Sequence, residues 1–429
     1  MSDTIIFDEA GSPASALGFS AIGVHAGFRP DPDRLDMALV VADEPAAAAA
    51  TFTQNVFCAA PVRVSREHLG ATGSAVPAYG CARAVVVNSG IANAATGDIG
   101  LENARATADI VAEAVGCPAN EVLVASTGVI GQHLNLAPFE TGVPAALAAM
   151  ETADSPQEKA GQGLTAARAI MTTDTVPKHG AVRFAGDDIG YPGATFTIGG
   201  MAKGAGMIMP NMATMIAVLA TDAPVAAPAL SEALTAAVAK SFNKVTVDSD
   251  TSTNDSCFLL ASGAAAPQAP VIQAGTPAAA RFQEALEALC TALARAMAAD
   301  GEGATRLVTV TVEGAATDDD ADAAARTVAN SPLVKTAIYG HDANWGRVAA
   351  ALGRSGARFN QEDVDIDILG LPVCRAGLVV DFDEDEALRR FDAPEVAIRV
   401  NLHAGEKSTT MWTCDFSHDY VTINGDYRS

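Results

Sequence analysis

The sequence predicts an α/β protein, because short apolar runs alternate along the chain with segments of helical periodicity. Residues 84–87 and 122–125 are apolar runs of strand length, and residues 102–115 between them have a helical pattern. Farther along, valine occupies every second position of residues 308–312, which is typical of a strand with one buried face.

Two further helices are expected in the second half of the chain. The first begins near Pro228, and its apolar residues recur at four-residue steps on one face. The second begins at Thr276 and Pro277, which suit a helix N-terminus, and ends at Asp300 and Gly301. The predicted buried faces are Leu230, Leu234, Val238 and Phe242 in the first helix and Phe282, Leu286, Leu289, Leu293 and Met297 in the second.

The length of 429 residues exceeds that of most single domains, so two or three structural units are expected. Residues 316–325 form an acidic stretch that we interpret as a boundary, with a smaller C-terminal unit beyond it. A solvated loop or the start of a helix explains this stretch equally well.

The charge of the chain argues against two classes of partner. Its 51 acidic and 27 basic residues give a formal net charge of -24, which repels nucleic acids and anionic membranes. The first residues lack a basic region followed by a long apolar core, and no run of about 18 apolar residues occurs. We expect a soluble, cytoplasmic protein.

Cysteine and histidine spacing gives no support to a metal site. The seven cysteines have no CxxC spacing, and the seven histidines form no HxxxH or HExxH pair. Lys203 precedes its glycines, so a phosphate-binding loop is also poorly supported. We therefore expect reduced thiols, no metal and no bound cofactor.

Residues 203–223 are the most informative segment, because Thr214 stands between a glycine-rich turn and an apolar strand expected at 215–220. Spacing alone favours a β-branched residue that enters a strand. The alternative is self-cleavage, in which Thr214 Oγ attacks the carbonyl of Ala213 and the resulting ester hydrolyses. The freed α-amine, whose ordinary pKa is about 7.7 to 8, would then act as a general base.

This segment and six other blocks resemble the ornithine acetyltransferase (glutamate N-acetyltransferase) family of arginine biosynthesis. The blocks occur in the order of that family, and the resemblance extends from about residue 59 to the last residue. They are ASTGVIG (125–131), AIMTTDTVPK (169–178), SFNKVTVDSDTSTNDS (241–256), DGEGAT (300–305), GHDANWGR (340–347) and INGDYRS (423–429).

The resemblance implies an αββα layered sandwich with a smaller C-terminal α/β domain from about 316 to 429. It also implies cleavage into an α chain, residues 1–213, and a β chain, residues 214–429, that assemble as α2β2. The implied activity is ping-pong transfer of an acetyl group from N2-acetylornithine to glutamate through acetyl-Thr214. Acetyl-CoA is a possible additional co-substrate.

Site residues follow from the same resemblance. Thr127 and Gly128 are the implied oxyanion-hole pair beside the nucleophile Thr214. The implied substrate pocket consists of Thr172, Lys203, Thr214, Glu302, Asn424 and Ser429. Lys203 suits a substrate carboxylate and Glu302 an ammonium.

Two blocks are assigned supporting roles. The acidic and hydroxyl residues of 241–256 lack the spacing of an EF-hand loop, so we expect a hydrogen-bonded turn that supports the nucleophile loop. In 340–347, we expect Asp342, Asn344 and Arg347 to surround a buried polar bend that caps a helix beginning near Trp345.

Several positions depart from the family pattern. Ile91 and Ala95 stand where the family typically has Asn and Cys, Ser249 stands where Gly is usual, and residues 23–39 form a longer segment. Alternatives are therefore a hydrolase of the self-cleaving aminopeptidase type with water as acceptor, a paralogue with another acyl-amino-acid substrate, or a non-catalytic paralogue.

Overall fold

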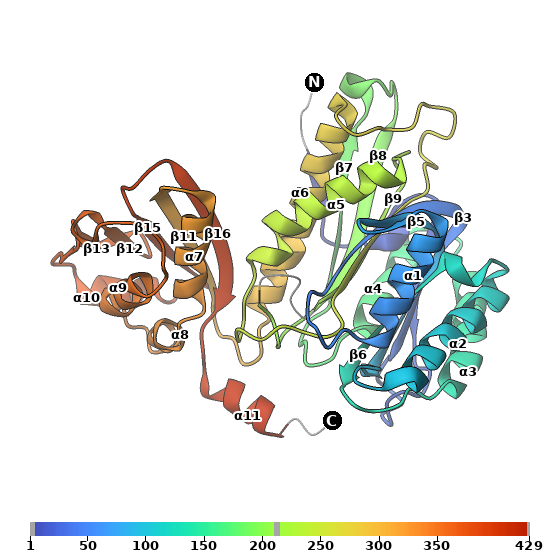
Figure 1. Ribbon diagram of the computed structural model, residues 1–429, viewed down its shortest axis with the longest axis horizontal. Helices are drawn as coiled ribbons and strands as arrows, with labels where there is room; N and C mark the ends of the chain where they lie inside the picture. The colour runs from blue at the N-terminus through green and yellow to red at the C-terminus, as the bar shows by residue number, and fades with distance from the viewer. Residues whose placement is uncertain (1–4, 210–214, 427–429) are drawn as a thin grey trace.

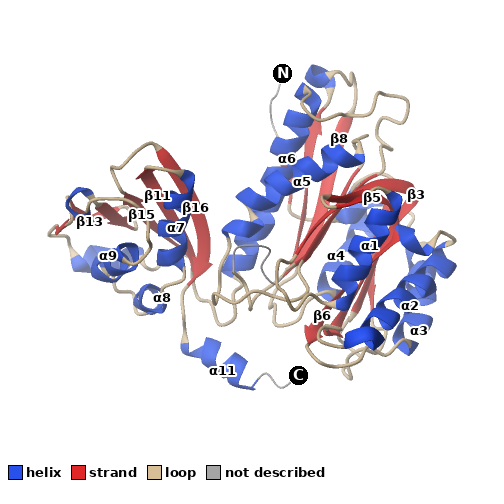
Figure 2. Cartoon of the chain, viewed as in Figure 1, coloured by secondary structure: helices blue, strands red, loops and turns tan. Residues whose placement is uncertain are grey.

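The computed structural model describes residues 5–209 and 215–426, so Ala213, Thr214 and Ser429 lie outside the described residues. Within these ranges the chain forms two β-sheets with helices packed around them (Figures 1 and 2). The larger sheet belongs to the first part of the chain and the smaller one to the C-terminal part.

Ten described strands form the larger sheet, in the order β1-β7-β8-β9-β10-β3-β5-β4, with β2 paired to β3 and β6 paired to β5. These strands are β1 (Ile6–Asp8), β2 (Phe19–Val24), β3 (Met37–Phe52), β4 (Ser74–Ala75), β5 (Ala78–Ile91), β6 (Val122–Val129), β7 (Lys178–Ala185), β8 (Thr195–Lys203), β9 (Ile216–Thr221) and β10 (Ser256–Ala261). The apolar runs predicted at 84–87 and 122–125 are therefore confirmed as parts of longer strands.

The long strand β3 divides this sheet into two layers. Its first half pairs with β2 and its second half with β10, and its pairing with β5 has an irregularity between Val41 and Ala46. Apolar side chains of β2, β5 and β6 meet those of β8, β9 and β10 in one core between the layers. Alternate residues of β9 thus enter opposite cores, which explains why its sequence is apolar throughout.

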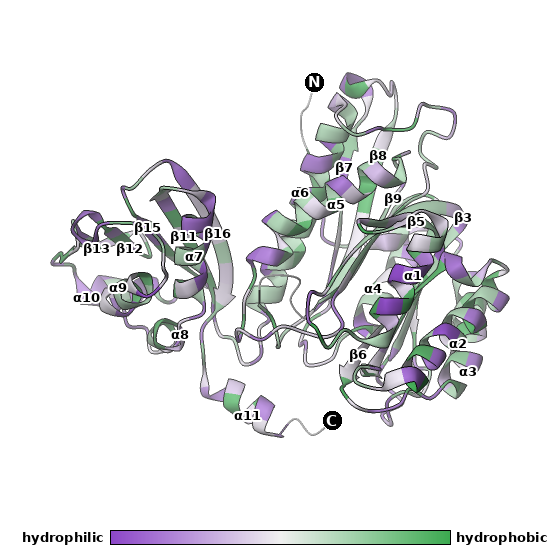
Figure 3. Ribbon diagram, viewed as in Figure 1, coloured by the Kyte–Doolittle hydropathy of each residue, from purple (hydrophilic) through white to green (hydrophobic). Residues whose placement is uncertain are grey.

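Helices cover both outer faces of the two layers. On one side lie α1 (Ala60–Thr72), α2 (Gly97–Val115) and α3 (Ala137–Met150), and on the other α5 (Ala227–Lys240) and α6 (Pro277–Ala299). A further helix, α4 (Pro156–Ala169), packs along β2. Hydrophilic and hydrophobic residues alternate along α1, α2 and α6, as expected for helices with one buried face (Figure 3). The predicted αββα sandwich is confirmed.

The apolar faces predicted for α5 and α6 are buried in the core that these helices form with β7–β10. Thr276 is the N-cap of α6 and accepts a hydrogen bond from the Ala279 N–H, while Asp300 follows the last turn. Phe242, the last apolar residue predicted for the first helix, is buried just beyond α5 in a short 3-10 helix.

The smaller sheet has the order β14-β13-β12-β15-β11-β16 and its own apolar core. Its strands are β11 (Leu307–Ala315), β12 (Asp365–Ile368), β13 (Leu371–Arg375), β14 (Leu378–Val379), β15 (Glu395–Asn401) and β16 (Lys407–Cys414). Its neighbouring helices are α7 (Asp318–Ala329), α8 (Pro332–Tyr339), α9 (Trp345–Gly353) and α10 (Glu384–Arg390). This sheet begins at Leu307, and the acidic stretch after it is the start of α7, capped by Thr317.

The last described helix, α11 (His418–Asp426), follows β16 and lies beside the large unit, near the end of β6 (Figure 1). This course brings a residue from the end of the chain to a pocket formed by the large sheet.

Candidate active site

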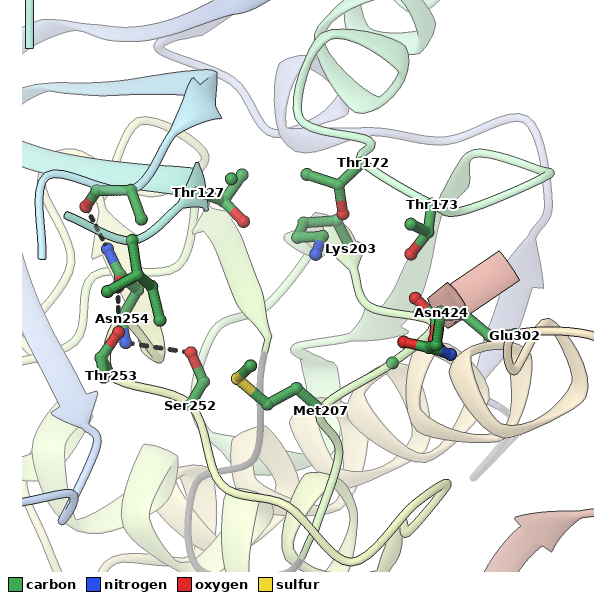
Figure 4. Close-up of a pocket in the computed structure, with 14 residues that line it drawn as sticks. Thr127, Thr172, Thr173, Lys203, Met207, Ser252, Thr253, Asn254, Glu302 and Asn424 are labelled. Carbon is green, nitrogen blue, oxygen red and sulfur yellow. Dashed lines mark hydrogen bonds between the residues drawn. The ribbon is translucent and has the colours of Figure 1, made fainter. Parts of the chain in front are cut away.

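A pocket opens where β6 and β8 end, and residues from seven separate segments line it (Figure 4). The lining residues are Ala92, Thr127, Gly128, Ile130, Thr172, Thr173, Lys203, Gly206, Met207, Ser252, Thr253, Asn254, Glu302 and Asn424. Six residues expected at the site therefore share one pocket: Thr127, Gly128, Thr172, Lys203, Glu302 and Asn424.

Thr127 and Gly128 lie at the end of β6, where this strand runs parallel to β5. Gly128 is paired with Gly90 and has a φ of 131°, a backbone conformation that favours glycine. A Cβ at this position would lie 2.2 Å from the carbonyl carbon of Gly90. Gly128 is therefore required by both its backbone conformation and the close approach of β5.

Lys203 ends β8 and is buried, with 2% of its surface exposed, yet it lines the pocket. Its Nζ lies 4.0 Å from Asp174 Oδ2, which is longer than a hydrogen bond. Burial lowers the pKa of Lys203, although the Asp174 carboxylate opposes this change. The Lys203 ammonium is thus a desolvated cation, and a second negative group beside it would stabilise its charged form.

Asp174 links this lysine to a second one. It accepts hydrogen bonds from Lys178 Nζ at 2.6 Å and from the Gly204 N–H at 2.7 Å, and Lys178 also pairs with Asp300 at 2.6 Å. Burial acts to raise the pKa of Asp174, but the Lys203 and Lys178 ammonium groups outweigh it and hold that pKa well below its ordinary value. Asp174 is therefore a carboxylate in the native state.

Glu302 provides a negative charge on another wall of the pocket and is only 8% exposed. Asn424 of α11 donates a hydrogen bond of 2.7 Å from Nδ2 to Glu302 Oε2, and the two side chains lie together in Figure 4. A Cβ on Gly206 would lie 2.3 to 2.4 Å from the Glu302 carboxyl group. Because Gly206 has no side chain, the Glu302 carboxylate can occupy the space beside it.

Thr172 lies just after α4, on the same wall as Lys203. Its N–H donates to Asp174 Oδ2 at 3.0 Å, and its carbonyl accepts a hydrogen bond of 2.5 Å from Arg34 Nη2. Arg34 belongs to the longer segment at residues 23–39, so this segment reaches the backbone of a pocket residue.

Residues 248–255 hydrogen-bond to the chain on both sides of 210–214. Asp248 accepts hydrogen bonds from the N–H groups of Met207 and Ile208, and Asp255 accepts one of 3.0 Å from the Met215 N–H. Burial raises the pKa of Asp255 well above its ordinary value, against the effects of the Met215 N–H and the Lys203 ammonium. Block 241–256 thus bonds to the described residues on both sides of 210–214, and its expected support of the nucleophile stays a prediction.

The GHDANWGR block lies elsewhere, in the smaller unit. Asn344 caps α9 as expected by accepting a hydrogen bond from the Arg347 N–H, but Asp342 is exposed and Arg347 is half-buried. The expectation of a buried bend is wrong, because the Arg347 guanidinium bonds to Leu333 O at the surface end of α8. None of these three residues lines the pocket.

Sequence reasoning missed Asp174 and Gly206. Asp174 stands in the AIMTTDTVPK block four residues before Lys178, a spacing that gives no sign of its contact with Lys203. Gly206 belongs to the glycine-rich turn, but its relation to Glu302 depends on the tertiary structure. Ala213, Thr214 and Ser429 lie outside the described residues, so their expected roles stay predictions.

Residues 5–209 and 215–426 contain no group of three or more His, Cys, Asp or Glu side chains placed to hold a metal ion. In the same part of the chain, no helix is both long and apolar enough to cross a bilayer. All seven cysteines are free thiols.

Comparison with known proteins gives the class of this protein as an enzyme that transfers acyl groups. The model of the ArgJ family matches residues 20–429, so the chain belongs to the ArgJ family. The arginine biosynthesis bifunctional protein ArgJ of Chlorobaculum tepidum is 47% identical over 412 residues, which cover 96% of each chain. That of Nitratidesulfovibrio vulgaris is 47% identical over 419 residues, which cover 97% of this chain and all of the relative.

Two solved structures are also similar. The arginine biosynthesis bifunctional protein ArgJ of Bacillus halodurans is 42% identical with a TM-score of 0.46, and the alignment covers 48% of this chain and 96% of the other. The ornithine acetyltransferase of Mycobacterium tuberculosis, solved with ornithine, is 38% identical with a TM-score of 0.41, over 48% of this chain and 98% of the other.

Proposed function

We propose that this protein cleaves itself between Ala213 and Thr214 and then transfers an acetyl group from N2-acetylornithine to glutamate. The observation that supports this most directly is the pocket, in which the Thr127–Gly128 turn, Lys203 and Glu302 line one space. Family membership at 47% identity over nearly the whole chain supports the same reaction class.

The charges of the pocket match the chemistry of the donor. N2-acetylornithine has a carboxylate and a side-chain ammonium, and the pocket offers a buried ammonium at Lys203 and a carboxylate at Glu302. Charge-assisted hydrogen bonds to buried groups are stronger than neutral ones, so opposite charges orient the donor. Glutamate also has an α-carboxylate for Lys203, so the two substrates are expected to bind in turn.

Self-cleavage begins with attack of Thr214 Oγ on the carbonyl carbon of Ala213. The Ala213–Thr214 amide bond breaks, its nitrogen takes the hydroxyl proton, and an ester joins the two residues. Water hydrolyses this ester, which leaves a carboxylate on Ala213 and a free α-amine and hydroxyl on Thr214.

Acetyl transfer then uses the same hydroxyl. Thr214 Oγ attacks the acetyl carbonyl while the Thr214 α-amine takes its proton, and Thr127 Oγ and the Gly128 N–H donate to the oxyanion. The C–N bond breaks, ornithine leaves with that proton on its amine, and an acetyl ester remains. The amine of glutamate attacks this ester, and Thr214 regains its proton as N-acetylglutamate forms.

Mass spectrometry and substrate panels test these steps. The purified protein is expected to contain two chains divided at Ala213, and Thr214→Ala is expected to give one intact, inactive chain. An intact wild-type chain with full activity would overturn the mechanism. The two cleaved chains are further proposed to assemble as α2β2, which native mass measurement tests.

The acceptor distinguishes transfer from hydrolysis. With acetylornithine alone, acetyl transfer predicts a single turnover of ornithine release, followed by continuous release when glutamate is added. Steady acetate release without glutamate would identify a hydrolase instead. Replacing acetylornithine by acetyl-CoA tests whether a thioester also serves as donor.

A further inference from the structure

We infer that Asn254 and Asp255 are paired positioning residues that set the distance between the Thr127–Gly128 turn and Met215, the residue that follows the proposed nucleophile. This inference rests on the proposed function and adds two residues to it. Asn254 bonds to the segments that hold the turn, and Asp255, the next residue, bonds to Met215 just before β9.

Asn254 joins two carbonyl groups through one side-chain nitrogen. Its Nδ2 donates to Ser126 O at 2.8 Å and to Ala92 O at 2.6 Å, and its Oδ1 accepts a hydrogen bond of 2.6 Å from Thr253 Oγ1. Figure 4 shows this side chain at the pocket wall beside Thr127. Ser126 immediately precedes Thr127, so the bond fixes the backbone of the turn where the oxyanion donors begin.

An amide is required at this position. The carbonyl oxygens of Ser126 and Ala92 can only accept hydrogen bonds. In Asn254→Asp, a carboxylate oxygen would replace the donating Nδ2 and would face both of these oxygens without a hydrogen bond. The side chain is only 5% exposed, so water cannot easily replace the lost donors.

Asp255 holds the other side of the site. Its Oδ1 accepts the Met215 N–H at 3.0 Å, while Met215 O accepts the Ser256 N–H at 3.1 Å. Met215 is thus held through both of its backbone polar groups, and residue 214 is covalently attached to it. The backbone carbonyl of Asp255 also accepts the Thr53 N–H, which ties this residue to the end of β3.

The pair therefore connects two elements that come from different layers. Ser126 belongs to β6, and Met215 immediately precedes β9. A displacement of about 1 Å between a nucleophile and its oxyanion donors can cost about 100-fold in rate. A rigid dipeptide that bonds to both sides is suited to prevent such a displacement.

Variants with matched controls test this inference. Asn254→Asp and Asp255→Ala are expected to lower kcat per cleaved molecule by about 100-fold and to slow chain cleavage, with KM changed by less than about threefold. The controls are Asn103→Asp, which loses a bond to Leu134 O, and Asp222→Ala, which loses bonds to the N–H groups of Thr197 and Leu17. These controls remove similar bonds away from the pocket, so kcat should stay within about threefold of wild type.

Asp255→Asn separates positioning from proton transfer. Its amide oxygen can still accept the Met215 N–H, so it is expected to restore kcat to within about tenfold of wild type. If Asp255→Asn is as inactive as Asp255→Ala, or if Asn254→Asp behaves like Asn103→Asp, the positioning role is overturned. If wild type shows neither cleavage nor acetyl transfer, the proposed function fails instead.

Discussion

Asp174 lies between two buried ammonium groups, bonded to Lys178 Nζ at 2.6 Å and 4.0 Å from the Nζ of Lys203, which lines the pocket. One carboxylate thus serves both the stability of the fold and the charge of the site.

Asp174→Asn is expected to destabilise the protein by about 3 to 5 kcal/mol, because it leaves two buried lysines without their shared carboxylate. Chemical denaturation measures this change. Glu67→Gln, which breaks an exposed pair with Arg105, is the control and should cost less than about 1 kcal/mol. Equal losses in the two variants would contradict the role given to Asp174.

The same carboxylate makes stability depend on acid pH. Because its pKa is lowered in the folded protein, its contribution is present above the unfolded pKa of about 3.9 and is lost as the pH falls below it. Wild type should therefore lose more unfolding free energy than Asp174→Asn between about pH 5 and pH 3. Parallel curves for the two proteins would show that Asp174 is not the group responsible.

Lys203 predicts a change in substrate binding at alkaline pH. Burial lowers its pKa, so the ammonium loses its proton below the ordinary lysine value of about 10.4. The KM for the donor should rise through this range, while Lys203→Met should have a high KM at all pH values. A KM that does not change between pH 7 and about pH 10 would remove Lys203 from carboxylate recognition.

Gly206→Ala tests the space that Glu302 occupies. The added methyl group would meet the Glu302 carboxyl group at 2.3 to 2.4 Å, so this side chain must move and release Asn424. We expect the KM for the ammonium-bearing donor to rise by about tenfold or more. Gly161→Ala in α4, where a Cβ meets nothing within 4 Å, is the control that should leave KM unchanged.

Ser249→Gly is expected to stabilise the protein by about 0.5 to 1 kcal/mol. Ser249 has a φ of 72°, a left-handed conformation that costs energy for a residue with a Cβ. Glycine adopts this conformation without that cost, so Ser249 leaves backbone strain at this position. Thermal unfolding measures the gain, and Ala160→Gly within α4 should instead lower stability.

Local patterns predicted much of the fold. The four-residue periodicity identified the buried faces of α5 and α6, and the alternating valines identified β11, because these signals depend only on neighbours along the chain. The bend of β3 and the order of the large sheet could not be predicted in this way. They depend on pairings such as β3 with β10, whose residues are about 200 positions apart.

The candidate site, like the fold, could be predicted only in part from the sequence. Thr127, Gly128, Lys203 and Glu302 were expected from sequence motifs, and the structure brings them to one pocket. Asp174 was missed because its contact with Lys203 depends on the pairing of β7 with β8, which joins Lys178 to Ala202. Sequence motifs thus predicted residues that line the pocket more readily than buried residues, such as Asp174, that contact the lining residues.

The pairing of β8 with β9 determines whether the two fragments would stay together after backbone cleavage. Lys203 of β8 is paired with Ile216 of β9, and β9 is held on its other edge by β10, which in turn pairs with β3. Strands from before and after the proposed scission are therefore interleaved in a single sheet. The two fragments should migrate as one particle in native conditions and separate only in denaturant. Cleavage would thus create two new chain ends without dividing the molecule.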